Sequence, residues 1–373
     1  MPLPAPLTPL LDASEDQDHV FASAFSVLKE AIAEHAFPAA SVAIAVRGRL
    51  IAVKAFGRFT YESGAQSVSP ATLFDLASLT KVVATTPMAM LLYQRGLLDL
   101  DAPVGAVVPE FVAASQRDPR RREVTFRMLL AHSSGLPAYE KLFLKSRTRD
   151  EWLHEVFVTP LTADPGTRAE YSDIGFILLA AALERVSDES LDRFCQREIF
   201  APLGMTQTAF NPPSEIRGQI PPTQDDQDFR HRVIQGEVQD ENASVLGGVA
   251  GHAGVFSTAA DLAQFGHSMI SPGTFIRRET IALFTRRESA PAGTSRTLGW
   301  DTPSDPSQSG RYFGPASFGH LGYTGTSLWI DPDRQLSIAL LTNRTWPDCS
   351  NHAIKQVRPR FHDAVILALE KCE

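Results

Sequence analysis

Apolar residues recur with two different periods along the chain, and the change of period divides it into three parts. A helix is predicted over 20–36, because apolar residues there recur at helical spacing: Phe21, Phe25, Leu28 and Ile32. Two apolar runs follow, Ser41–Val46 and Leu50–Phe56, joined by Arg47-Gly48-Arg49. Two such runs around a short glycine-containing turn predict a β-hairpin.

The middle of the chain has mainly helical periodicity. Helices are predicted over 79–95, 125–131, 149–158, 174–186, 191–199 and 259–270. Pro87 predicts a kink in the first of these helices, and Gly96 predicts its end. Residues 211–245 are polar and proline-dotted, which predicts a long functional or mobile loop.

Strand character returns near the C-terminus. Short apolar runs at 317–323, 326–330 and 336–342 are separated by turns, and an amphipathic helix is predicted over 351–369. This order predicts an α+β fold, in which N- and C-terminal segments form an antiparallel sheet flanked by terminal helices. We expect residues 18–72 and 290–373 to form this α/β sheet domain. Residues 73–289 would form an inserted, mainly helical domain, with the active site between the two.

Composition excludes several classes of protein. The 373 residues are 43% hydrophobic and 21% charged, with a formal net charge of -8 and no basic cluster interleaved with aromatics, so no nucleic-acid partner is expected. No apolar stretch predicts a membrane span, and the first residues do not resemble a signal peptide. Cys195, Cys349 and Cys372 suggest neither a disulfide framework nor metal-ligand spacing. A cytoplasmic protein that acts on small molecules without a cofactor or metal is predicted.

Candidate chemistry begins at Phe74–Lys81. Ser78 and Lys81 stand three residues apart at the head of a predicted helix, so their side chains leave on one face. A lysine whose pKa is lowered can take the proton of a serine nucleophile, and a helix N-terminus favours a developing oxyanion. On their own, the two residues also fit a serine N-cap followed by a solvated lysine.

Two segments far along the chain contain further candidate site residues. Tyr171-Ser172-Asp173 precedes an apolar helix, and His320-Leu321-Gly322 lies in a predicted strand. In isolation, Tyr171 also fits a tyrosine packed on a core, and His320 a structural strand histidine. His132 and His252 lack a third ligand at metal spacing and are interpreted as structural.

Taken together, the three segments resemble the serine β-lactamase and penicillin-binding protein superfamily, on its class C and family VIII carboxylesterase side. The resemblance runs from about residue 18 to the end and includes 129–137, 247–258 and 319–332. It implies that Ser78 is acylated, that Lys81 holds and shuttles its proton, and that Tyr171 acts with Lys81 as general base. Tyr171 suits this role if nearby cations, Lys81 and His320, lower its pKa.

By the same resemblance, the backbone N–H groups of Ser78 and Tyr323 form the oxyanion hole, and Thr324 lines the same strand edge. Gly322 would let the substrate approach the backbone closely. Two positions depart from the β-lactamase pattern. Asp173 replaces an asparagine and is placed to bond Lys81 or a substrate amide. His320 replaces a lysine, which disfavours a site tuned to the β-lactam carboxylate.

The predicted function is a serine hydrolase that acts through an acyl-Ser78 intermediate on small ester or amide substrates. The alternatives are a D-amino-acid peptide or muropeptide amidase, a DD-peptidase of cell-wall metabolism, and a weak β-lactamase. A silent β-lactam-binding or sensor protein on the same fold is the non-enzymatic alternative. Residues 211–245 and 286–316 are expected to shape the mouth of the pocket.

Overall fold

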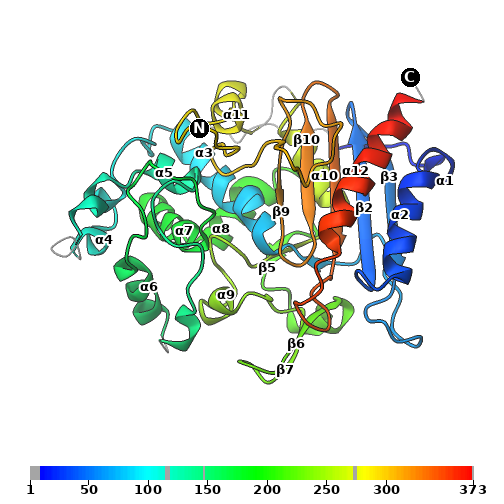
Figure 1. Cartoon of the computed structure of the whole chain (residues 1–373), viewed down its shortest axis with the longest axis horizontal. Coiled ribbons are helices and arrows are strands. Elements are labelled where there is room, and N and C mark those ends of the chain that lie inside the picture. The colour runs from blue at the N-terminus through cyan, green and yellow to red at the C-terminus, as the bar shows by residue number, and fades with distance from the viewer. Residues whose placement is uncertain (1–8, 114–117, 146–147, 272–274, 372–373) are drawn as a thin grey trace.

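A six-stranded sheet made from both ends of the chain forms one side of the molecule (Figure 1). The computed structural model describes residues 9–113, 118–145, 148–271 and 275–371. Within them, the strand order is β1-β3-β2-β11-β10-β9. All neighbours pair antiparallel except the two-residue edge strand β1, which is parallel to β3. The predicted hairpin and the three C-terminal strands are confirmed.

The sheet strands are β1 (Leu11–Asp12), β2 (Ala39–Val46), β3 (Arg49–Gly57), β9 (Phe318–Leu321), β10 (Ser327–Asp331) and β11 (Leu336–Thr342). Smaller sheets contain β4 (Phe74–Asp75), β5 (Ala209–Phe210), β6 (Pro222–Asp226), β7 (Arg232–Gln235) and β8 (Val255–Ser257). The helices of the N-terminal half are α1 (Gln17–Val20), α2 (Ala22–Ala33), α3 (Thr86–Gln94), α4 (Pro109–Ala113), α5 (Phe126–Leu130), α6 (Arg149–Val158) and α7 (Asp173–Ser187). Those of the C-terminal half are α8 (Leu191–Cys195), α9 (Glu241–Val245), α10 (Ala259–Ser268), α11 (Arg278–Thr285) and α12 (Ile354–Glu370).

Hydrophobic cores cover both faces of the sheet, because the buried strands alternate with a period of two residues. In β2, Val42 and Ile44 face a core shared with α2 and α12, whereas Ala43 and Ala45 face the core that continues into the helical part. Helix α10 packs on this second face, where the small alanines of β2 let it approach closely.

The predicted α+β fold is confirmed, and α4–α8 gather beside the sheet as Figure 1 shows. The division at residues 72/73 and 289/290 stays a prediction. Helix α10, assigned from the sequence to the helical domain, lies against β2 and β11 of the sheet.

Two segments differ from the sequence prediction. The stretch 211–245 is not one loop, because it forms the β6–β7 hairpin and α9. The predicted helix over 79–95 starts with a π-helical turn, Lys81–Thr85, and Pro87 lies in the first turn of α3. The helical backbone is continuous through Thr85 and Thr86, so Pro87 removes one N–H donor where the π-helical turn passes into α3.

Cys372 and the first eight residues, which were expected not to resemble a signal peptide, lie outside the described part of the chain. Within the described residues, no helix combines the length and apolarity needed to cross a membrane.

Candidate active site

Ser78 lies in a constrained turn between β4 and the π-helical turn. Its neighbour Ala77 has a φ of 47°, in the left-handed region that disfavours a side chain. The buried Asp75 stabilises this conformation by accepting hydrogen bonds from the N–H of Ala77 (2.8 Å) and of Gln239 (2.7 Å). Burial raises the pKa of Asp75 to about 6. The segment therefore holds the Ser78 hydroxyl, which is half-buried, in one position.

Lys81 lies one turn further on, with its side chain fully buried. Its Nζ donates to Ser78 Oγ (2.9 Å), to Asp173 Oδ1 (2.7 Å) and to the carbonyl of His252 (3.1 Å). Burial lowers the pKa of Lys81, and the Asp173 carboxylate opposes this shift without cancelling it. The pair Ser78-x-x-Lys81 is therefore not a solvated surface feature, and burial makes its ammonium easier to deprotonate than that of an exposed lysine.

Tyr171 completes a three-residue contact at Ser78, since its hydroxyl donates to Ser78 Oγ at 2.6 Å. Burial and the Asp173 carboxylate raise the pKa of Tyr171 well above 10. The sequence prediction of a lowered pKa is therefore wrong, because these two effects outweigh the nearby cations. Tyr171 is a neutral phenol at pH 7, able to donate a proton but not poised as a phenolate.

The start of α7 fixes both Tyr171 and Asp173. Ser172, between them, is the N-cap: its Oγ accepts from the N–H of Gly175 (2.9 Å) and donates to the carbonyl of Pro137 (2.6 Å). The backbone N–H of Ser172 donates to His132 Nδ1 (3.0 Å), so this histidine is structural, as predicted.

His320 lies in β9 beside Tyr171, with 6.0 Å between the two ring centroids. Burial lowers the pKa of His320 well below 6.5, and the charges of Lys81 and Arg296 act in the same direction. The expectation that His320 carries a partial charge is therefore wrong. Its Nδ1–H donates to the carbonyl of Leu321 (2.8 Å), and among the described residues its buried Nε2 has no partner.

The residues after β9 pass close to the Ser78 turn. At Gly322, an added Cβ would lie 2.4 Å from the carbonyl oxygen of Leu76 and 1.9 Å from Thr326 Oγ1. Glycine is therefore required here by the packing of the chain itself, and the close approach of a substrate stays a prediction. Thr324 is fully buried, and its hydroxyl donates to the carbonyl of Asp75 (2.8 Å), so it ties the two segments together and does not line the cavity.

Tyr323 differs from Thr324, because it lines the cavity with about half of its side chain exposed. Among the described residues, its backbone N–H has no hydrogen-bond acceptor. That group is free to bind an oxyanion, as the predicted role requires.

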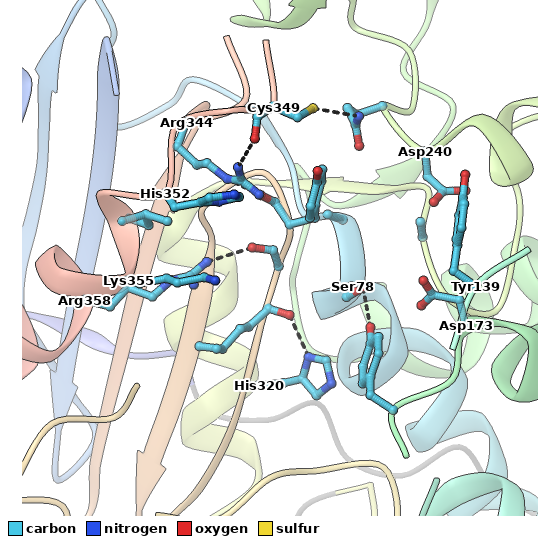
Figure 2. A pocket seen from close by; sticks show the side chains of 18 of the residues that line it. Ser78, Tyr139, Asp173, Asp240, His320, Arg344, Cys349, His352, Lys355 and Arg358 are labelled. Carbon is cyan, nitrogen blue, oxygen red and sulfur yellow. Dashed lines mark hydrogen bonds between the residues drawn. The ribbon is translucent and has the colours of Figure 1, made fainter. Parts of the chain in front are cut away.

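A cavity of about 760 Å³ opens in front of Ser78. Figure 2 shows acidic groups, Asp173 and Asp240, on one side of Ser78, and cationic groups of Arg344, Lys355 and Arg358 on the other. Of the residues predicted as site residues, those that line the cavity are Ser78, Tyr171, Asp173, His320, Gly322 and Tyr323.

Several lining residues were not predicted from the sequence. Arg296 is a second cation near the phenol after Lys81, with its guanidinium 5.6 Å from the Tyr171 ring centroid and 3.7 Å from the Asp301 carboxylate. Its segment, 286–316, was assigned to the pocket mouth, but a single arginine in an irregular stretch gives no pattern that singles it out. Arg344, Lys355 and Arg358 carry no local motif either.

No group of three or more histidine, cysteine or carboxylate side chains is arranged to hold a metal ion within the described ranges.

Comparison with known proteins identifies the family. The family model described as "Beta-lactamase" matches residues 24–357, so the chain belongs to this family. The serine-containing site and the fold define it as a serine hydrolase of the β-lactamase type.

Its relatives have different named activities. The chain is 34% identical over 307 residues to a putative D-alanyl-D-alanine carboxypeptidase of Escherichia coli K12, covering 73% of this chain and 69% of that protein. It is 32% identical over 346 residues to the N-acetylmuramyl-L-alanine amidase of Bacillus subtilis 168, covering 83% and 77%. The structure of EstCE1, a hydrolase with promiscuous acyltransferase activity, aligns with a TM-score of 0.77 and 22% identity over 94% of this chain and 99% of that one. The last likeness establishes the shared fold alone.

Proposed function

We propose that the protein hydrolyses an ester or amide bond through an acyl intermediate on Ser78. One observation carries this proposal: Ser78 Oγ lies within hydrogen-bond distance of a buried amine, Lys81, and of a neutral phenol, Tyr171. A serine hydroxyl needs a base to become nucleophilic, and a buried lysine with a lowered pKa provides one.

In the acylation step, neutral Lys81 takes the proton of Ser78 while Oγ bonds to the substrate carbonyl carbon. The negative charge that develops on the carbonyl oxygen is stabilised by the N–H groups of Ser78 and Tyr323. Tyr171 gives its proton to the leaving oxygen or nitrogen as that bond breaks, and Lys81 then returns a proton to Tyr171. Lys81 and Tyr171 thus end the acylation step in the protonation states in which they began it.

Deacylation uses the same groups with water in place of the leaving group. Tyr171 accepts one proton of the water as it passes its own proton to Lys81, while the water oxygen bonds to the acyl carbon. That proton returns to Ser78 Oγ when the ester bond breaks and the carboxylic acid leaves. Asp173 keeps Lys81 in place throughout through their 2.7 Å contact.

For the natural substrate, we propose a cell-wall peptide fragment, cleaved at a muramyl-peptide or D-alanyl amide bond. Support comes from the two relatives, which are named as a D-alanyl-D-alanine carboxypeptidase and an N-acetylmuramyl-L-alanine amidase. The charged lining of the cavity suits a substrate with several ionised groups better than an apolar ester. A cytoplasmic location, also proposed, fits the recycling of such fragments.

The test compares four substrates with the wild type and Ser78→Ala: a p-nitrophenyl ester, a chromogenic cephalosporin, N-acetylmuramyl-L-alanyl-D-isoglutamine and a D-alanyl-D-alanine peptide. We expect turnover of the ester and of one peptide, little turnover of the cephalosporin, and a loss of at least about 10³-fold in Ser78→Ala. Thermal unfolding of both proteins checks that the variant is folded, since removing a half-buried hydroxyl has a small effect on stability.

Cephalosporin turnover above that of the ester would instead identify a β-lactamase. Acylation by a β-lactam, seen as an added mass on the intact wild type without turnover of any substrate, would support the silent binding protein and overturn the proposal.

A further inference from the structure

A short hydrogen-bonded segment brings Arg296 to the edge of the sheet, beside Tyr171. Arg296 forms an antiparallel bridge with Asp301, and Asp301 forms another with Gly319 of β9. Asp301 and Gly319 exchange two backbone hydrogen bonds of 2.9 Å each. Gly319 directly precedes His320, so the backbone of Arg296 is anchored to the strand that carries this site residue.

The Arg296 side chain lines the cavity, where it is 22% exposed, and its guanidinium lies 5.6 Å from the centre of the Tyr171 ring. Its Nη1 is 3.7 Å from the Asp301 carboxylate, which is longer than a hydrogen bond. Asp301 accepts hydrogen bonds from Ser295 Oγ (2.7 Å) and from the N–H of Thr302 (3.0 Å). The carboxylate therefore compensates the guanidinium only in part, and the positive charge still acts on Tyr171.

The other basic groups beside Tyr171 do not carry a permanent charge. The rings of His132 and His320 lie 4.7 Å and 6.0 Å from the phenol ring, and burial lowers the pKa of both histidines well below 6.5. Lys81 Nζ lies 4.8 Å from the same ring, but its charge changes as it takes and returns a proton in the proposed mechanism. A guanidinium does not lose its proton in a protein, so Arg296 stays positive in every step.

This permanent charge opposes the groups that make Tyr171 a weak acid. Burial and the Asp173 carboxylate raise the pKa of Tyr171, whereas the hydrogen bond to Ser78 and the charge of Arg296 lower it. A cation near an aromatic ring also favours a negative charge on that ring. Arg296 is thus placed to restore part of the acidity that Tyr171 loses in its buried position.

We propose that Arg296 is a positioning residue that acts through Tyr171, because its permanent charge helps the buried phenol give a proton to the leaving group. This inference rests on the proposed acyl transfer to Ser78 and adds a residue to it. The proton leaves the Tyr171 oxygen as the bond from the carbonyl carbon to the leaving oxygen breaks, and the guanidinium stabilises the phenolate charge that develops. Lys81 then returns a proton to Tyr171. Arg296 needs no contact with the substrate in this role.

The test uses neutral aryl acetates that differ in the leaving group alone: 4-nitrophenyl, 4-chlorophenyl, phenyl and 4-methylphenyl acetate. All of them form the same acetyl-Ser78, so differences in kcat/KM arise before that intermediate is complete. 4-Nitrophenolate leaves readily without a proton, whereas the phenolates of weaker acids need one increasingly. The quantity measured is the slope of log kcat/KM against the pKa of the leaving phenol.

We expect Arg296→Met to lower kcat/KM by about fivefold for 4-methylphenyl acetate and by less than about twofold for 4-nitrophenyl acetate, so the slope becomes more negative. Asp301→Asn should change the slope in the opposite direction, since it removes the carboxylate that partly compensates the cation. A general loss of packing would lower all the rates alike and would not move the two slopes apart. If Arg296→Met does not fold, Asp301→Asn decides the matter.

The matched control is Arg287→Met. Arg287 belongs to the same segment and is exposed, and its guanidinium donates to Thr302 Oγ1 (2.8 Å) and to the carbonyl of Pro303 (2.6 Å), outside the cavity. This variant should keep the wild-type slope. An unchanged slope in Arg296→Met, with Ser78-dependent turnover, would overturn the role of Arg296 and leave the proposed function standing. An equally steep slope in Arg287→Met would also overturn it, because the loss of net charge alone would then explain the effect.

If no aryl acetate is turned over in a Ser78-dependent way, the proposed function fails, and the effect of Arg296 on Tyr171 is measured without turnover. The tyrosines are replaced biosynthetically by 3,5-difluorotyrosine, whose phenol is more acidic, and the ¹⁹F resonance of position 171 is assigned from its absence in Tyr171→Phe. A titration midpoint that rises in Arg296→Met and not in Arg287→Met supports the role of Arg296. Identical titration curves in the wild type and Arg296→Met overturn it.

Discussion

The two proton-transfer residues beside Ser78 share one environment but respond to it in opposite directions. Burial disfavours the charged form of each group, so it lowers the pKa of the Lys81 ammonium and raises that of the Tyr171 phenol. Both groups are thereby biased toward their neutral forms. These directions support the proposed roles of Lys81 as the base and Tyr171 as the proton donor.

This assignment predicts the pH profile of Tyr171→Phe. In the wild type, kcat/KM for a neutral ester should rise with pH as Lys81 loses its proton, with an apparent pKa below 10.5. In Tyr171→Phe, we expect the plateau to fall by about 10²–10⁴-fold while the apparent pKa of the rising limb is retained. Steady-state rates from pH 5 to 10 measure both quantities. Disappearance of the rising limb in the variant would show that Tyr171, and not Lys81, is the titrating base.

At the residue scale, the sequence predicted which side chains meet but not their charges. The contact between Ser78 and Lys81 follows from their three-residue spacing, whereas the roles of Tyr171 and Asp173 were expected from the family resemblance. The neutral state of His320 and the raised pKa of Tyr171 depend on burial by residues far away in the sequence, which a local motif does not contain.

At the scale of elements, the start of α7 positions two site residues, Tyr171 and Asp173, at the same time. Ser172 caps the helix and bonds the Pro137 carbonyl, so the chain on either side of it is fixed. Tyr171 then points to Ser78, and Asp173 points to Lys81. A small change in the helix cap should therefore also change the rate of the catalysed reaction.

We predict that Ser172→Ala lowers the free energy of unfolding by about 1 kcal/mol and also lowers kcat by about tenfold. Thr148→Ala is the matched control, because Thr148 caps α6 through the N–H of Glu151 and lies away from the cavity. It should lose a similar amount of stability and keep the wild-type kcat. Urea unfolding and ester turnover measure the two effects, and an equal kcat in both variants would show that the α7 cap does not position the site.

Element prediction succeeded where the hydrophobic period was strong and failed where polar residues form regular structure. Helix α6 begins and ends where its apolar period predicts. The β6–β7 hairpin was missed because its strands, Pro-Thr-Gln-Asp-Asp and Arg-Val-Ile-Gln, lack clear apolar alternation. The π-helical turn at Lys81–Thr85 was missed because its apolar and threonine residues also fit an ordinary helix.

At the scale of the whole molecule, stability depends on α12 closing one face of the sheet. His362 of α12 is fully buried, with Nδ1 bonding the carbonyl of Ser309 (3.1 Å) and Nε2 lying 3.3 Å from Ser327 Oγ of β10. Burial lowers the pKa of His362 from 6.5 to about 3. In acid, the unfolded chain takes up a proton at this residue and the folded protein does not, so stability falls as the pH drops below 6.5.

Between pH 7 and pH 5, this single residue should cost the wild type about 2 kcal/mol of unfolding free energy relative to His362→Gln. Other titrating groups are common to both proteins and cancel in the comparison. Urea unfolding of the two proteins at both pH values measures the difference. A gap between them that stays constant from pH 7 to pH 5 would show that His362 is not held neutral in the fold.

The pairing of β2 with β11 brings Ala40 opposite Thr342, about 300 residues apart in the sequence. During synthesis, the first sheet strands must therefore wait for most of the chain to leave the ribosome before they gain their central neighbour. The second proposed oxyanion donor, the backbone N–H of Tyr323, comes from a late segment after β9. A nascent chain thus carries Ser78, Lys81 and Tyr171 long before Tyr323, and we expect hydrolytic activity to begin only when the closing strands of the sheet have been translated.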